Sequence, residues 1–277
     1  MNTLSLNRRA WPGAGAVVAE AMSRQRTLTF FALLMLAATV PAALALGLDA
    51  RTVRGVDVWV KPLKFMAALA LFSFSTAWFI GLLPEARRRA PAIRFIVASI
   101  LGAGGLEIGY IVLQSALGQA SHYNYSDRLH ALLYTAMGAG ALLLCATQGV
   151  LAVQIARHGR TDIDPAWRLA VVRGLWLTLL LGAGAGAMLG GMQAPAGVGL
   201  PVVGWHASGD LRPAHFLGMH AQQLLPLSGL VLAGWPAARA RATLNAAVAI
   251  YVLLWLALMA VGLHGAHPTP IPTQLPR

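Results

Sequence analysis

Histidine and glutamine side chains interrupt an apolar stretch near the C-terminal third of the chain. The stretch GDLRPAHFLGMHAQQLLP, residues 209–226, places His215, His220 and Gln223 where the sequence otherwise has the pattern of a membrane helix. Polar and titratable groups are costly in hydrocarbon, so their presence there is a hypothesis about function. Imidazoles in such a position can bind a metal or haem, or relay protons.

Helical geometry determines which histidines can act together. At about 100° per residue, His215 and His220 lie roughly 140° apart around a helix, so they do not share a face. A bis-histidine site would therefore take His130 from one helix and His215 or His220 from another. The helix that carries His130 and the helix that carries His215 and His220 are both expected to start at the outer side of the membrane. The positive N-terminal ends of these helices favour neutral imidazoles. Such ligands suit copper or haem better than magnesium or calcium, although simple hydrogen bonding remains the alternative for His130 and His215.

Glu107 is the carboxylate expected to support this chemistry. It interrupts an apolar run, and at a rise of ~1.5 Å per residue both Glu107 and His220 lie roughly 10 to 14 Å below the same surface. The two side chains could therefore meet. Glu107 is the predicted catalytic residue, as proton acceptor or as a group that supports a ligand.

Other polar residues collect on the same side of the predicted bundle. Lys61 and Lys64 could extend to the lipid headgroups, or could join the site by pairing with Asp57 or Glu107. His122 resembles the loop histidines His206, His264 and His267, which are expected to be solvated or interfacial, but it is also a candidate. The predicted cofactor-binding residues are Lys61, Lys64, Gln114, His122, Asn124, Arg128, Tyr134, Asp210, Arg212 and Gln223.

Composition identifies the class of protein that must position these residues. The chain has 277 residues, of which 57% are hydrophobic and 11% charged. Such a chain is too apolar for a soluble domain and indicates a multi-pass membrane protein. The net charge of +12 comes from basic clusters between apolar runs, which set topology and do not indicate nucleic-acid binding. Zinc-protease, CxxC, phosphate-loop and dinucleotide motifs are absent from the sequence.

Seven apolar runs are long enough to span a bilayer as helices. Basic residues between them favour a cytoplasmic N-terminus and an outer C-terminus, although Arg51, Arg54, Lys61 and Lys64 in the first outer loop contradict this rule. We therefore predict an all-α, polytopic bundle of about seven transmembrane helices. The runs lie near residues 28–48, 62–83, 92–116, 129–154, 168–192, 214–235 and 244–264.

The chain divides into a cytoplasmic segment 1–26, a helical domain 27–264 and a proline-rich periplasmic tail 265–277. A cleaved signal peptide is the alternative for the first run, but its length favours a retained helix.

Three local features are also predicted within this domain. Asp127 and Asp210 are expected to cap the fourth and sixth helices. Pro226 should kink the sixth helix. Glycines spaced four residues apart predict close helix packing at Gly182, Gly186 and Gly190, and at Gly105 and Gly109.

Four motifs are similar to those of a known group of proteins. They are WVKPLKF, LEIGYIVLQ, GQASHYN and GDLRPAHFLGMHAQQ, which together cover most of residues 55–235. The chain resembles a family of uncharacterised bacterial integral membrane proteins, which implies an inner-membrane location but no defined activity. A fainter likeness to haem- and copper-containing membrane proteins concerns only histidines at helix ends.

These observations leave three functions open. The first is membrane redox chemistry at an outward-facing pocket that binds haem b, copper or a quinone, with a redox partner or quinone beside the lipid bilayer. The second is a proton-coupled transporter or channel for a small polar or anionic solute, in which Glu107 and His220 relay protons. The third is a membrane sensor or assembly factor. Whether the protein is an enzyme stays open.

Overall fold

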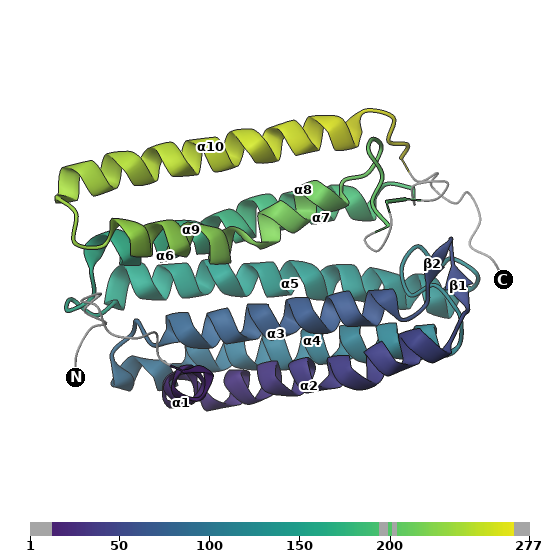
Figure 1. The fold of residues 1–277 in the computed structure, drawn as a ribbon, viewed down its shortest axis with the longest axis horizontal. Helices are drawn as coiled ribbons and strands as arrows, with labels where there is room; N and C mark the ends of the chain where they lie inside the picture. Colours follow the sequence, from purple (N-terminus) through teal and green to yellow (C-terminus); the bar gives the residue numbers. More distant parts are fainter. Residues whose placement is uncertain (1–12, 194–198, 201–203, 269–277) are drawn as a thin grey trace.

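The computed structural model describes residues 13–193, 199–200 and 204–268. Within these ranges the chain forms an all-α bundle, whose long helices run side by side along one axis (Figure 1). The strands described are β1 (Thr52–Val53) and β2 (Val56–Asp57), which pair as a short antiparallel hairpin at one end of the bundle. The predicted fold class is confirmed.

Six helices of the described chain are long and apolar enough to cross a membrane. Five of them are single helices, and the sixth is assembled from α6 (Pro165–Leu177), the π-helix η2 (Thr178–Gly182) and α7 (Ala183–Gly190). The chain is therefore a multi-pass membrane protein. The five single helices are α2 (Arg26–Leu48), α3 (Val60–Ile80), α4 (Pro91–Ala116), α5 (Arg128–His158) and α10 (Ala237–Leu263).

The predicted sixth helix, near residues 214–235, is present as two short helices. α8 (Arg212–Met219) and α9 (Ala221–Leu232) meet at His220, and together they run along the bundle (Figure 1). Pro226 lies inside α9, and the break between α8 and α9 falls six residues earlier, at His220. At the break, the hydroxyl of Thr178 in η2 accepts a hydrogen bond at 3.0 Å from the backbone N–H of Gln222, a donor near the start of α9.

Glycine contacts decide how closely these helices approach. A Cβ on Gly182 would lie 2.9 Å from Met219 Sδ, and one on Gly186 would lie 3.0 Å from the His215 ring. The predicted close packing is confirmed at these two positions. It is wrong at Gly105, Gly109 and Gly190, because these glycines point away from the neighbouring helices. A Cβ at each of them would meet no neighbouring atom of the described chain within 4 Å.

The main apolar core joins α2, α3, α4, α5 and α6, with Ile80, Ile96 and Leu151 among its fully buried side chains. α10 is more peripheral and contacts α6, α8 and α9 through smaller clusters. Its outer face carries exposed leucine and isoleucine side chains, such as Ile250 and Leu253. Apolar residues on the outside of a bundle are expected where the surroundings are lipid.

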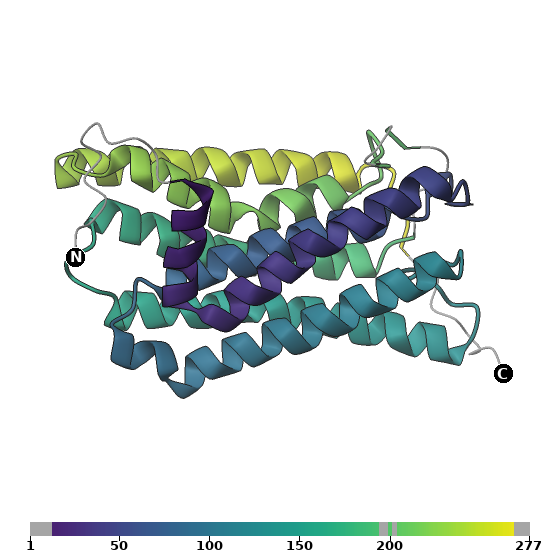
Figure 2. The same cartoon turned by 60° about the horizontal axis from the view of Figure 1, so that its bottom comes forward.

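A short amphipathic helix, α1 (Ala14–Arg24), lies across the bundle instead of along it (Figure 2). Its last residue, Arg24, donates to the Trp78 carbonyl at 3.0 Å and lies over the Trp78 ring, while also pairing with Glu20 at 2.8 Å. These contacts attach α1 to the end of α3. The segment between α3 and α4 includes the short 3₁₀ helix η1 (Glu85–Arg89), whose three arginines lie at the same end of the bundle as α1 (Figure 1). We call this end the basic end.

The opposite end, which carries β1 and β2, is here called the hairpin end. Its basic residues have partners in the folded chain: Arg51 pairs with Asp49 at 2.7 Å, and Arg54 donates to the Tyr123 carbonyl at 3.1 Å. Lys61 donates to Ser121 at 2.7 Å. The cations that contradicted the topology rule are thus engaged locally. Of the predicted terminal segments, residues 1–12 and 269–277 lie outside the described chain.

Candidate functional site

A chain of polar contacts enters the bundle from the hairpin end. The Lys61 ammonium donates to Ser121 Oγ at 2.7 Å, and Ser121 Oγ lies 3.3 Å from Nδ1 of His122. The other ring nitrogen of His122, Nε2, lies 3.8 Å from Glu107 Oε1. Four residues from α3, α4 and the 117–127 loop are thereby connected in series, and Glu107 itself is buried.

Two strained backbone positions hold His122 in place. Arg54 and Tyr123 have φ angles of 55° and 54°, which lie in the left-handed region that residues other than glycine rarely adopt. Arg54 and Gly55 form the turn of the hairpin, and the Arg54 guanidinium donates to the carbonyls of His122 and Tyr123. Strain of this kind persists only where surrounding contacts enforce it, and it gathers at functional sites.

Aromatic rings surround the imidazole of His122. Its ring centroid is 5.9 Å from that of Phe65 and 5.7 Å from that of Tyr134. Tyr134 also contacts Tyr123 and Tyr125. The Tyr123 hydroxyl donates to the Leu189 carbonyl at 3.0 Å, so the 117–127 loop is joined to the end of α7. This wall leaves about a quarter of the His122 side chain exposed.

The electrostatic surroundings of the site are cationic. Lys61 lies within electrostatic range of Arg54, Lys64 and Arg212, and Glu107 is the acidic group in the same set. Burial, together with the positive charge of Lys61, holds the pKa of His122 well below its usual range. The imidazole is therefore neutral at neutral pH.

The Asp210 carboxylate, beside this site, forms hydrogen bonds that stabilise the start of α8. Its carboxylate accepts hydrogen bonds from the Arg212 guanidinium at 2.7 Å and from the backbone N–H groups of His206 and Arg212 at 2.9 Å. Burial disfavours its charge, but these hydrogen bonds outweigh burial and hold the pKa of Asp210 below its ordinary value. The predicted cap is therefore displaced by one residue: Leu211 occupies the N-cap position of α8, while Asp210 binds the first helical N–H.

The predicted metal ligands do not converge. His130 Nδ1 contacts Asp127 at 2.6 Å, and its Nε2 faces Gln114 at 3.5 Å. Asp127 also caps α5 by accepting from the His130 backbone at 2.9 Å, which confirms the predicted cap. Among the residues that the structure describes, no group of three or more His, Cys, Asp or Glu side chains is placed to hold a metal ion.

His215 and His220 instead form hydrogen bonds around the break between α8 and α9. His215 Nδ1 donates to the Gly182 carbonyl of η2 at 2.9 Å, so this histidine joins α8 to the π-helix. His220 Nδ1 lies 3.2 Å from Gln223 Oε1, and the Gln223 amide donates to Ser75 of α3 at 3.2 Å. The predicted meeting of Glu107 with His220 is wrong, because the loop histidine His122 takes that place at the ion-pair distance from Glu107.

The remaining candidates divide between structural and peripheral positions. The Asn124 amide donates to the Ala120 carbonyl at 2.9 Å and stabilises the 117–127 loop. Lys64 and Arg128 are exposed at the hairpin end. Gln114 and Tyr134 lie beside the polar chain without entering it.

Buried amides without partners lie around the helix break. Gln222 is 1% exposed, and neither its Oε1 nor its Nε2 has a hydrogen-bond partner within the described chain. The Oε1 atom of the buried Gln148 on α5 is also unpartnered there. Gln222 lies beside the π-helix, because its backbone N–H donates to Thr178, whereas the amide nitrogen of Gln148 donates to Thr147 and Thr76. Buried amides of this kind are normally satisfied by water or a ligand.

Sequence reasoning missed Ser121, Tyr123 and Arg54 as parts of the site. Ser121 directly precedes His122 in the GQASHYN motif, so the sequence already indicated that its hydroxyl could contact the His122 ring. Arg54 and Gly55 together form a turn with two positive φ angles, but only the folded loop reveals that the guanidinium reaches the carbonyl of Tyr123.

Comparison with protein-family models, curated proteins and solved structures finds no match. The fold and the site themselves define the class: a multi-pass helical membrane protein with a buried lysine–serine–histidine–glutamate chain at one end of its bundle.

Proposed function

We propose that this protein is a proton-coupled carrier or channel for a small anionic solute, with Glu107 as the proton-accepting group. The observation that supports it most strongly is the contact series from Lys61 through Ser121 and His122 to Glu107. Titratable groups inside a membrane bundle commonly form proton relays. The resemblance of its motifs to bacterial membrane proteins favours an inner-membrane location with the hairpin end facing the periplasm.

The hydrogen-bond directions are consistent with a relay. Lys61 can only donate, so Ser121 accepts from it and can pass its own hydroxyl hydrogen to Nδ1 of His122. The neutral imidazole then carries its proton on Nε2, which faces Glu107. The 3.8 Å gap is longer than a hydrogen bond, and a small approach or one bridging water closes it. The net result of one passage is a proton lost by Lys61 and gained by Glu107.

Solute charge couples to this movement through Lys61. An anion beside the ammonium stabilises its charged form and leaves Glu107 ionised, whereas departure of the anion favours transfer of the proton to Glu107. The electrostatic potential around Lys61 is positive because three further cations act on it: Arg54, Lys64 and Arg212. A positive potential at the hairpin end attracts anions.

A quinone site is the second candidate, supported by the aromatic wall. The rings of Phe65 and Tyr134 flank His122, which could donate a hydrogen bond to a quinone oxygen while Glu107 accepts the associated proton. Haem or copper ligation by the predicted histidines has less support, because those side chains are bonded elsewhere in the bundle.

The test is anion-driven proton movement in proteoliposomes. Vesicles with a trapped pH-sensitive dye receive an inward gradient of phosphate, sulfate or succinate, and wild-type protein should acidify the interior with at least one of them. Glu107→Gln should abolish proton movement while anion binding persists, and Lys61→Met should abolish both. Glu20→Gln, which removes an exposed carboxylate on α1, is the matched control.

Two results would contradict the carrier. One is the absence of anion-dependent acidification for all three anions in correctly folded protein, and the other is full coupling in Glu107→Gln. A visible spectrum with metal analysis, followed by quinone titration of the same sample, then distinguishes the redox candidates.

A further inference from the structure

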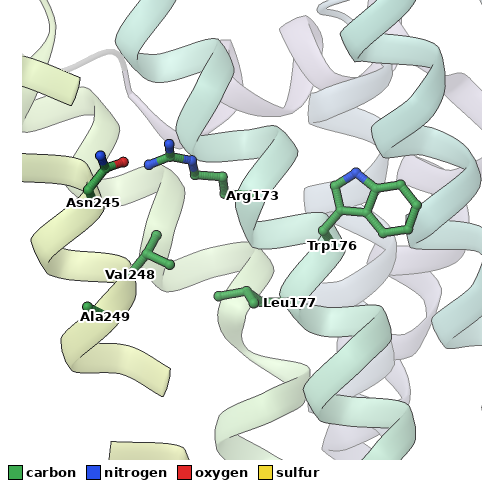
Figure 3. Close-up of a pocket in the computed structure, with 6 residues that line it drawn as sticks. All are labelled: Arg173, Trp176, Leu177, Asn245, Val248 and Ala249. Atoms are coloured by element: carbon green, nitrogen blue, oxygen red, sulfur yellow. The ribbon is translucent and has the colours of Figure 1, made fainter. Parts of the chain in front are cut away.

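A groove lies between α6 and α10, on the outer side of the bundle and remote from the Lys61 site. It has a volume of about 390 Å³, and Figure 3 shows the Arg173 side chain extending from α6 toward Asn245 of α10. The other lining residues are apolar. The full lining consists of Arg173, Trp176, Leu177, Asn245, Val248 and Ala249.

Arg173 carries a charge that the described chain leaves uncompensated. Its Nη1 atom is buried and has no hydrogen-bond partner among the described residues. The charged group within its electrostatic range is Arg241, a second cation. Arg173 is half-buried and Arg241 is exposed, and their like charges repel each other, so the groove is suited to an anion that contacts both.

The depth of these residues matches a lipid headgroup. Arg173 lies eight residues inside the start of α6 at Pro165, and Asn245 lies eight residues inside the start of α10 at Ala237. At ~1.5 Å per residue this is roughly 12 Å from the basic end, and Arg241 is about one turn nearer to that end. Long basic side chains extend along the bundle to reach phosphates at the interface.

The remainder of the groove is suited to a hydrocarbon chain. Leu177, Val248 and Ala249 continue from the polar pair toward the middle of the bundle (Figure 3). Trp176 also lines the groove and is 37% exposed, and its ring points away from Asn245 and Val248 (Figure 3). An inorganic anion would leave this apolar part unused.

We propose that the groove is a binding site for one anionic phospholipid. The phosphate contacts Arg173, Arg241 and Asn245, and an acyl chain follows the apolar lining. Basic pockets between transmembrane helices on the cytoplasmic side commonly hold such headgroups. This site is independent of the proposed proton relay, because it shares no residue with that relay.

Quenching of Trp176 by brominated lipids tests this site in the full-length protein. The Trp176 signal is the difference between wild type and Trp176→Phe, recorded in bilayers that contain brominated phosphatidylglycerol or brominated phosphatidylcholine. Half-maximal quenching should need about tenfold less of the anionic lipid, as expected for charge-assisted hydrogen bonds. Arg173→Gln should remove this preference, and Arg173→Lys should keep most of it.

Arg239→Gln is the matched control, because Arg239 lies on the same helix as Asn245 but stacks on Trp235 outside the groove. It should keep the wild-type preference. Equal quenching by the two lipids in wild-type protein overturns the proposal without any substitution, as does an unchanged preference in folded Arg173→Gln. Displacement of the lipid by millimolar inorganic phosphate would identify a soluble-anion site and also overturn it.

Discussion

His122 Nε2 lies 3.8 Å from Glu107 Oε1, although the two residues belong to a surface loop and to the interior of a transmembrane helix. The pairing brings a titratable group of the hairpin end into contact with a carboxylate buried in the bundle. It also connects Glu107 to Lys61, because Ser121 contacts both Lys61 and His122.

The first prediction concerns the titration of His122. Burial and the charge of Lys61 lower its pKa, so its titration midpoint should lie well below 6.5. Lys61→Met should raise the midpoint without restoring 6.5, because burial remains. Lys64→Met is the control and should leave it unchanged. Histidine NMR, assigned with His122→Asn, measures the midpoint, and a wild-type value at or above 6.5 would contradict the prediction.

The same pKa shift determines the sign of a pH effect on stability. A histidine whose folded pKa is lowered binds fewer protons in the folded state, so its contribution is complete above its unfolded pKa of about 6.5. That contribution should diminish as the pH falls from 6.5 toward the folded pKa. His122→Asn should therefore flatten the dependence of the thermal midpoint on pH below 6.5.

The second prediction concerns close helix approach. A Cβ on Gly218 would lie 2.6 Å from the backbone N of Gly182, so Gly218→Ala should separate α8 from η2 and cost about 1–3 kcal/mol of unfolding free energy. Gly105→Ala and Gly109→Ala are matched controls whose Cβ would meet nothing in the described chain within 4 Å, and they should leave stability unchanged or higher. Unfolding in detergent gives the comparison. Equal losses in all three variants would exclude the packing argument.

The third prediction concerns the start of α9. Thr178→Val removes the acceptor of the Gln222 N–H and should cost about 1–3 kcal/mol, the usual penalty of an unsatisfied buried donor. Amide exchange should accelerate most at Gln222. Thr135→Val removes an exposed hydroxyl on α5 and is the control. Unchanged exchange at Gln222 would show that the hydroxyl does not cap α9.

The fourth prediction concerns Asp210. Asp210→Ala removes the acceptor of Arg212 and of two backbone N–H groups, so it should cost on the order of 3 kcal/mol. Because the folded pKa of Asp210 is lowered, its contribution is present above its unfolded pKa of 3.8 and is lost as the pH falls through the folded pKa. Asp162→Asn, in an exposed pair with Arg160, should leave stability unchanged. A wild-type thermal midpoint for Asp210→Ala would contradict this assignment.

The transmembrane helices were predictable because their signal is local. Runs of apolar residues are required for each crossing, and the predicted run 92–116 differs by one residue from α4. Asp127 was also predictable as a cap, since the cap and the N–H that it binds are three residues apart.

The helix break and the site were not predictable in the same way, because both depend on distant contacts. The break at His220 faces a π-helix some forty residues earlier, through the hydrogen bond from Gln222 to Thr178. The partner of Glu107 depends on a loop whose conformation is fixed by Arg54, which lies 69 residues before Tyr123. The rise per residue predicted a common depth for Glu107 and His220 but carried no information about that loop.

The contact of Arg24 with Trp78 has a consequence for the order in which the chain enters the membrane. Arg24 precedes the first apolar helix, and Trp78 lies near the end of the second, so the contact requires that both have been inserted as an antiparallel pair. During synthesis, the contact between Arg24 and Trp78 is therefore absent while α2 enters alone, and it forms only after α3 has crossed. Cross-linking of cysteines at these two positions in stalled nascent chains should appear only once α3 has left the translocon.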